Sequence, residues 1–273
     1  MALNNKDNIT MRAQILPAST GWLWIKQGIY LFKKSPVLWV VLSIIGIVGL
    51  IGIASIPVIG DPLATLLFPS LFSGLLLGCK ALENDEELEL AHLFAGFQHN
   101  TQQLVTLGGL NLVGQLLIFG IMMLAGGAAL VGILMSSTPV EDPSLIAQAM
   151  SGAGFAILLG MILFTLLLMS TQFAPMLVTF DKISPFQALK ISLRSCWKNL
   201  APLSVYGAIM MLFALLASLP MMLGWLVLLP IMITSIYAAY RGMFPTPEVL
   251  TGAPTEIKED IFTPDKDAFR KDE

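Results

Sequence analysis

Few residues in this sequence have the type and spacing that enzyme or metal chemistry needs. His92 and His99 are two helical turns apart, about 10 Å along a straight helix, which is too far for both to bind one metal ion. Ser195 and Cys196 follow a basic residue that could activate a thiol, but no histidine lies nearby in the sequence to act as a base. We therefore predict no metal site, no cofactor and no enzyme activity.

Three amide side chains lie within long apolar segments, where a polar group needs a partner. They are Asn111, Gln115 and Gln172. Asn111 and Gln115 are four residues apart and therefore share one face of a helix. The two interpretations are hydrogen bonds between helices and the lining of a polar path across a membrane. Because the interiors of these segments hold no Lys, Arg, Glu or His, hydrogen bonding is the favoured interpretation.

Aromatic and basic side chains gather just before the first and the fifth apolar segments. They are Trp22, Trp24, Lys33 and Lys34 in the first cluster, and Lys190, Arg194, Trp197 and Lys198 in the second. Aromatic rings combined with cations are typical of the lipid headgroup level. Such residues either anchor the neighbouring helices in the bilayer or bind particular headgroups. Anchoring is the simpler interpretation, and headgroup binding is the functional one.

The composition explains why these few groups must act at or in a membrane. Hydrophobic residues make up 56% of the 273 residues and charged residues only 12%, whereas a soluble domain carries about a quarter charged residues. A soluble fold could not bury so much apolar surface. The apolar residues form continuous runs of about 20, long enough to cross a ~30 Å hydrocarbon core as helices. We predict an all-α, polytopic membrane protein.

Six spans and their orientation follow from the apolar runs and the charges between them. The predicted spans are 37–56, 61–79, 104–135, 152–178, 201–219 and 221–240, paired as three hairpins. On this assignment all 15 Lys and Arg residues lie on one side of the membrane. The positive-inside rule then places both termini in the cytoplasm.

Each hairpin is preceded by a short segment with apolar residues at helical spacing, which predicts an interfacial amphipathic helix. The three apolar stripes are Trp22, Ile25, Ile29 and Phe32; Leu90, Leu93, Phe94 and Phe97; and Phe186, Leu189, Leu193 and Trp197. Pro69 precedes Lys80 by 11 residues, and Pro230 precedes Arg241 by the same interval. Either the chain holds three divergent copies of one unit, or segments before spans share these features generally.

Small residues mark a surface for close helix packing. Ser70, Gly74 and Gly78 recur every four positions in the second predicted span. This spacing lets another helix approach the backbone, within the bundle or from a partner.

The sequence also carries a family resemblance. The segments GWLWIKQGIYLFKKSP (21–36), GCKAL (78–82) and HLFAGF (92–97) resemble an uncharacterised family of proteobacterial inner-membrane proteins, over about residues 15–244. The repeated pattern is similar to the membrane domain fused to some bacterial glycerophosphodiester phosphodiesterases. In those proteins a separate soluble domain carries the hydrolytic chemistry, so the resemblance implies topology and supplies no catalytic residue.

These observations predict a six-helix membrane domain at 18–244, between a flexible cytoplasmic tail at 1–17 and a disordered cytoplasmic tail at 245–273. The functional hypothesis is a non-enzymatic integral membrane protein that binds lipids or membrane-protein partners as an accessory, assembly or organising factor. The alternative is a passive or lipid-handling transporter with a cavity between the hairpins. The expected partners are the phospholipid bilayer and either another membrane protein or a second copy, with no nucleic acid.

Overall fold

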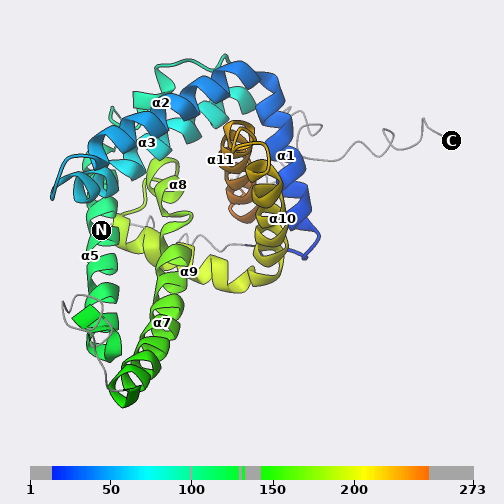
Figure 1. Ribbon diagram of the computed structural model, residues 1–273. Helices are drawn as coiled ribbons and strands as arrows, with labels where there is room; N and C mark the ends of the chain where they lie inside the picture. Colours follow the sequence, from blue (N-terminus) through cyan, green and yellow to red (C-terminus); the bar gives the residue numbers. More distant parts are fainter. Residues whose placement is uncertain (1–13, 99, 129–130, 133–142, 246–273) are drawn as a thin grey trace, which may run out of the picture. The chain divides into compact units, whose positions relative to one another are not determined.

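The computed structural model describes residues 14–98, 100–128, 131–132 and 143–245, and its labelled elements are all helical (Figure 1). In order they are α1 (Thr20–Lys34), α2 (Pro36–Ala54), α3 (Gly60–Glu83), α4 (His92–Ala95), α5 (Thr101–Met122), the π-helix η1 (Met123–Gly127), α7 (Pro143–Thr171), α8 (Ala174–Thr179), α9 (Pro185–Lys198), α10 (Leu200–Ser218) and α11 (Trp225–Met243). The predicted tails lie mostly outside the described residues.

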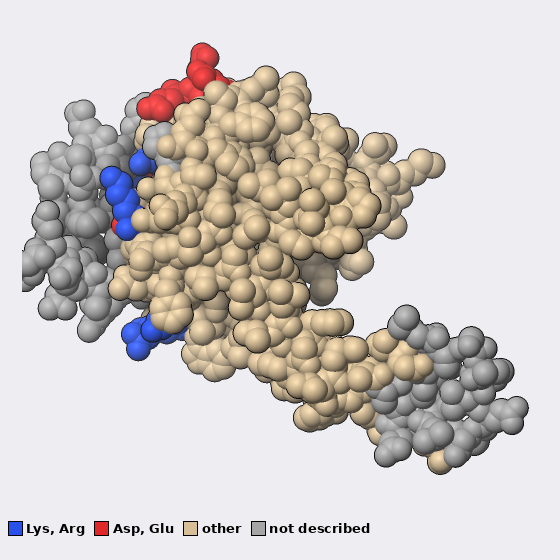
Figure 2. All heavy atoms as spheres, turned by 90° about the vertical axis from the view of Figure 1, so that its left-hand side faces the viewer, with Lys and Arg blue, Asp and Glu red and all other residues tan. Residues whose placement is uncertain are grey.

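Six helical segments within the described residues are long and apolar enough to cross a membrane, which confirms the predicted class of protein. They are Pro36–Ala54, Gly60–Glu83, Thr101–Gly127, Ser151–Thr179, Leu200–Ser218 and Trp225–Met243. Many of their large apolar side chains face outward, such as Phe119 at 63% exposed and Leu215 at 63%. Figure 2 shows wide stretches of surface without a charged side chain. Lipid is the solvent that accepts such a surface.

The chain forms two compact units, and each is described separately. The first contains the described residues of Met1–Gly52, Ser70–Thr101 and Arg194–Glu273, and the second contains those of Ile53–Pro69 and Gln102–Leu193. Four helices, α2, α3, α5 and α9, contain residues of both units.

Helix α1 packs closely against α10 and α11 within the first unit (Figure 1). A side chain at Gly28 would meet the backbone nitrogen of Ser235 at 2.6 Å, and one at Gly21 would meet the backbone nitrogen of Tyr206 at 2.9 Å. The hydroxyl of Thr234 donates a hydrogen bond of 2.8 Å to the carbonyl oxygen of Gly28. The two glycines therefore let the backbone of α1 approach both neighbours.

This packing rotates the buried face of α1 away from the apolar stripe predicted for it. The buried residues are Gly21, Trp24, Ile25, Gly28 and Leu31. Of the predicted stripe only Ile25 is among them, and Trp22 is 41% exposed. The face of α1 that contacts protein contains its glycines. A stripe of large apolar side chains does not include glycines and therefore did not indicate this face.

The loop that follows α3 packs against the small residues of this helix. A side chain at Gly74 would meet the carbonyl oxygen of Leu93 at 2.6 Å, and one at Gly78 would meet the side chain of Leu88 at 2.6 Å. Leu88 and Leu93 are both buried. An amphipathic helix was predicted in this loop, but only the single turn of α4 is helical. The rest of the loop packs its backbone against α3 and does not form a longer helix.

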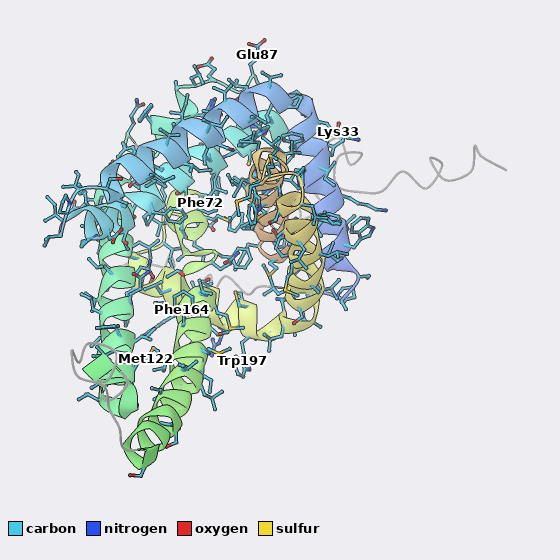
Figure 3. The ribbon with its side chains drawn as sticks, in the orientation of Figure 1. Lys33, Phe72, Glu87, Met122, Phe164 and Trp197 are labelled. Carbon is cyan, nitrogen blue, oxygen red and sulfur yellow. The ribbon has the colours of Figure 1, made fainter. Side chains whose placement is uncertain are left out.

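The second unit contains a pair of long helices that pack through glycines. A side chain at Gly114 of α5 would meet Leu167 of α7 at 2.8 Å, and Gly160 of α7 lies against the side chain of Met122 (Figure 3). At η1, Gly126 has a φ of 126°, and a side chain there would meet the carbonyl oxygen of Gly152 at 2.6 Å. Only glycine tolerates both the conformation and the contact.

The span predicted at 152–178 is interrupted between α7 and α8. The backbone N–H of Phe173 donates to the hydroxyl of Ser192 at 3.1 Å, and that hydroxyl donates to the carbonyl oxygen of Met169 at 2.7 Å. One serine of α9 therefore satisfies two backbone groups freed by the break. Such satisfaction is what irregular backbone inside a membrane protein requires.

Candidate functional site

Helix α9 has two faces whose compositions are the reverse of a water-soluble helix. Its inward face is buried and contains Ala188, Ser192, Ser195 and Cys196. Asn199, the residue that follows the helix, is buried as well. Its outward face exposes Phe186 at 60% and Trp197 at 62%. Soluble helices bury large apolar residues and expose serines, while membrane helices pack through small residues. The buried face of α9 therefore has the small residues typical of packed membrane helices, and its outward face exposes two large aromatic rings.

Three cations lie on the same outward side of α9, next to its two aromatic rings. Lys190, Arg194 and Lys198 are exposed and follow one another at intervals of one helical turn. The ammonium nitrogen of Lys190 lies 4.4 Å from the ring centroid of Phe186. Figure 3 shows Trp197 on this helix. We call Phe186, Lys190, Arg194, Trp197 and Lys198 the basic aromatic face of α9.

The cations of this face have no acidic partner within the described part of the chain. The ion pairs there involve other cations: Lys34 with Asp85 at 2.8 Å, and Arg241 with Glu83 at 2.9 Å. The three cations are therefore available to an anion from outside the described residues. Lipid phosphates at the surface of a bilayer are one class of such anions.

Helix α1 carries a related outward stripe. Trp22, Lys26, Tyr30 and Lys33 are exposed and recur at intervals of three or four residues. The ammonium nitrogen of Lys26 lies 5.6 Å from the centroid of the Trp22 ring, and that of Lys34 lies 5.7 Å from the Tyr30 ring. Lys26 and Tyr30 were missed as candidates, although their alternation with Trp22 and Lys33 at helical spacing was a visible signal.

Trp24 is a correction to the predicted interfacial cluster. Its side chain is 1% exposed, and its ring meets that of Tyr206 edge-on at a centroid distance of 6.3 Å. The indole is held between helices of the first unit, so its ring is covered by protein and is not part of the outward side of α1. Lys34 is also engaged by protein, since its ammonium group donates to the carbonyl oxygen of Leu82 at 2.6 Å and pairs with Asp85.

A second polar cluster joins the C-terminal ends of α3 and α11. The carboxylate of Glu83 accepts hydrogen bonds from the hydroxyl of Tyr237 and from Arg241, whose Nε lies at 3.0 Å and Nη2 at 2.9 Å. The Glu83 side chain is 12% exposed. With three donors on one carboxylate, this arrangement satisfies a buried charge and clamps two helices together.

The three intramembrane amides lie on α5 and just after α7. Asn111, Gln115 and Gln172 are half-buried. Within the described residues no hydrogen bond joins their side chains to one another. Both interpretations of these amides, as hydrogen-bonding partners between helices and as the lining of a polar path, stay predictions.

The two histidines can be located only in part. His92 accepts a hydrogen bond of 3.0 Å at its Nδ1 from the backbone N–H of Glu89, and so helps to close the turn at α4. His99 lies outside the described residues. Within the described residues, no three His, Cys, Asp or Glu side chains are grouped as metal ligands would be. Cys79 and Cys196 are both buried as free thiols.

Comparison with known proteins identifies the family. The model of a domain of unknown function, DUF7847, matches residues 24–257. The chain belongs to the DUF7847 family. It is also similar to a probable inner membrane protein of Burkholderia thailandensis, with 33% identity over 260 residues, which cover 87% of this chain and 94% of the relative. No solved structure matches the chain.

The DUF7847 match contains most of the features described above. Residues 24–257 include all of α9, most of α1, and the polar cluster in which Glu83 accepts from Tyr237 and Arg241. Trp22 lies just before the match begins. The Burkholderia relative is named as an inner membrane protein, and the six apolar helices agree with that placement. This chain is therefore a multi-pass inner-membrane protein of an uncharacterised proteobacterial family, as the sequence resemblance predicts.

Proposed function

We propose that this protein is a non-enzymatic inner-membrane factor that binds phospholipid headgroups through the basic aromatic face of α9, assisted by the outward stripe of α1. The observation that carries the proposal is a helix face with three exposed cations that have no acidic partner among the described residues, flanked by two exposed aromatic rings. In this role the protein would organise lipids around itself or around a partner in the membrane.

The expected strength of this binding follows from the charges. Each cation near an anionic leaflet contributes about 1 kcal/mol, so three cations contribute about 3 kcal/mol in favour of anionic over zwitterionic lipid. Phe186 and Trp197 add affinity for the interface without regard to headgroup charge. The face should therefore prefer phosphatidylglycerol or cardiolipin to phosphatidylethanolamine.

This preference can be tested by changing the charge of α9. The triple variant Lys190→Gln, Arg194→Gln and Lys198→Gln should retain anionic lipid at least about tenfold less well than the unchanged protein. Native mass spectrometry from nanodiscs of defined lipid mixture measures the retained lipids. The matched control, Lys190→Arg, Arg194→Lys and Lys198→Arg, keeps every charge and should retain them normally.

The two proteins should also be examined for other bound masses. Equal retention of anionic lipid by the neutral and the charge-conserving variants would contradict the proposal. A stoichiometric protein mass lost only from the neutral variant would identify α9 as a docking face for a membrane-protein partner instead.

We further propose that both termini face the cytoplasm, because all Lys and Arg residues lie on one side of the six spans. Fusions of a reporter that is active only in the periplasm should be inactive at either terminus and active after Pro57, in the loop between α2 and α3. Activity at one terminus alone would mean an odd number of spans and would refute this topology.

A further inference from the structure

The C-terminal end of α11 lies beside the C-terminal end of α9, because both are tied to the same residue. The N–H of Gln14 donates to the carbonyl oxygen of Met243 at 3.0 Å. The side-chain amide of Asn199, the residue after α9, donates to the carbonyl oxygen of Gln14 at 2.9 Å and accepts from the N–H of Leu16 at 2.9 Å. These groups belong to one compact unit. Met243 and Asn199 are thus bridged by a single residue, with the bonded atoms within about 10 Å.

The chain that continues from this point is acidic. Residues 246–273 contain eight acidic and four basic residues, a formal net charge of −4. The stretch 256–261 reads Glu-Ile-Lys-Glu-Asp-Ile, so three acids and two isoleucines surround the single base Lys258, and its formal net charge is −2. Glu256 follows Pro245 by 11 residues, which can extend about 36 Å and therefore reach the last turn of α9, in the same compact unit, from the end of α11.

We propose that the acidic stretch 256–261 of this chain docks on the basic aromatic face of α9 and competes there with anionic lipid. The carboxylates match the cations of Arg194 and Lys198, and the isoleucines match the exposed ring of Trp197. The competition rests on the lipid binding proposed above; the docking itself does not. The tail acts as an internal competitor that keeps the face occupied until the surrounding leaflet is rich in anionic lipid.

A tethered competitor of this kind is effective even when its contacts are weak. A short flexible connection gives a tethered group an effective concentration in the millimolar range. Ion pairs exposed to water are weak and are screened by salt. The tail should therefore be displaced by anionic lipid or by high salt, and it should shift lipid affinity by a modest factor.

The docking can be tested directly with a zero-length carbodiimide cross-linker on the full-length protein in nanodiscs of zwitterionic lipid. We expect bonds between Lys198 or Lys190 and the carboxylates of Glu256, Glu259 or Asp260, identified by peptide mass spectrometry. Their yield should fall when phosphatidylglycerol is included or when salt is raised. A mixture of isotopically heavy and light protein should show that the bonds form within one chain. Bonds between heavy and light chains, or acids joined evenly to lysines of other elements, would overturn the proposal.

The competition between the tail and anionic lipid can be measured separately from the docking. The variant Glu256→Gln, Glu259→Gln and Asp260→Asn, in nanodiscs of mixed phosphatidylglycerol and phosphatidylethanolamine, should retain phosphatidylglycerol between about twofold and tenfold better than the unchanged protein. When α9 also carries its three glutamines, the tail substitutions should give no gain. Unchanged affinity in the tail variant, with reduced affinity in the α9 variant, would refute the competition alone. Unchanged affinity in the α9 variant would instead refute the proposed function.

Discussion

Replacing Gly28 with alanine should lower the unfolding midpoint of the detergent-solubilised protein more than most single substitutions. The added methyl group would meet the backbone nitrogen of Ser235 at 2.6 Å and its Cα at 2.7 Å. Since backbone atoms cannot rotate aside, α1 must move away from α11, and the hydrogen bond from Thr234 to the Gly28 carbonyl is strained with it. Overpacking of this kind costs about 1–3 kcal/mol, and more where backbone must shift.

The matched control for this variant is Gly207→Ala in α10. Nothing lies within 4 Å of a side chain added at Gly207, which is exposed. Alanine also has a higher helix propensity than glycine by about 1 kcal/mol, so the control should be neutral or slightly stabilised. Thermal unfolding of both variants, followed by fluorescence of a thiol-reactive dye at the buried cysteines, would measure the difference. Equal midpoints for the two variants would contradict the close packing of α1 on α11.

Replacing Glu83 with alanine is the second substitution with a large expected effect. The change removes the carboxylate that accepts from Tyr237 and Arg241, and leaves a half-buried guanidinium without its partner. Breaking a buried ion pair costs about 3–5 kcal/mol, but the Arg241 side chain is 29% exposed and water relieves part of this cost. We expect a loss of about 2–3 kcal/mol in the free energy of unfolding.

Asp85 offers a control carboxylate two residues further on. It pairs with Lys34, but its side chain is 54% exposed, so Asp85→Asn, which keeps a residue type tolerated at the positive φ of this position, should cost less than about 1 kcal/mol. Urea or SDS unfolding in mixed micelles would compare the two variants. A double-mutant cycle of Glu83→Ala with Arg241→Ala should show a coupling that the Asp85 and Lys34 pair lacks. If Glu83 and Asp85 proved equally dispensable, the clamp between α3 and α11 would have no energetic role.

The number and class of the helices could be predicted because they depend on local composition. An apolar run of about 20 residues is sufficient reason for a span, and charges that gather between the runs define their ends. The interruption after Thr171 was missed for the opposite reason. It depends on Ser192 of α9, which is far away in sequence and satisfies the backbone groups that the break exposes.

The contacts between helices could not be predicted from periodicity. The buried face of α1 is marked by Gly21 and Gly28, and glycine contributes nothing to an apolar stripe. Consequently Trp24 was assigned to the headgroup layer although it is packed against Tyr206. Glu83 meets Arg241 across 158 positions of sequence, and nothing local to either residue indicates that pairing.

The candidate site was more accessible to sequence reasoning because it lies on single helices. Lys190, Arg194 and Trp197 follow one another at helical spacing, so a shared face could be predicted without knowing what the helix packs against. Their exposure in the structure leaves that face open to lipid. What the sequence alone did not show is that the opposite face of α9 consists of small, buried residues.

The central claim, that the outward face of α9 meets lipid headgroups, is tested most directly by a nitroxide scan along this helix in nanodiscs. Single cysteines at residues 186–198, in a background without Cys79 and Cys196, would carry the label. We predict that probes at Arg194 and Trp197 collide with both lipid-dissolved oxygen and a water-soluble nickel chelate, as expected at headgroup depth. Probes at Ala188 and Ser195 should collide with neither. Nickel access without oxygen access at Trp197 would place this face in water, and access to neither would place it under protein; each result would contradict the claim.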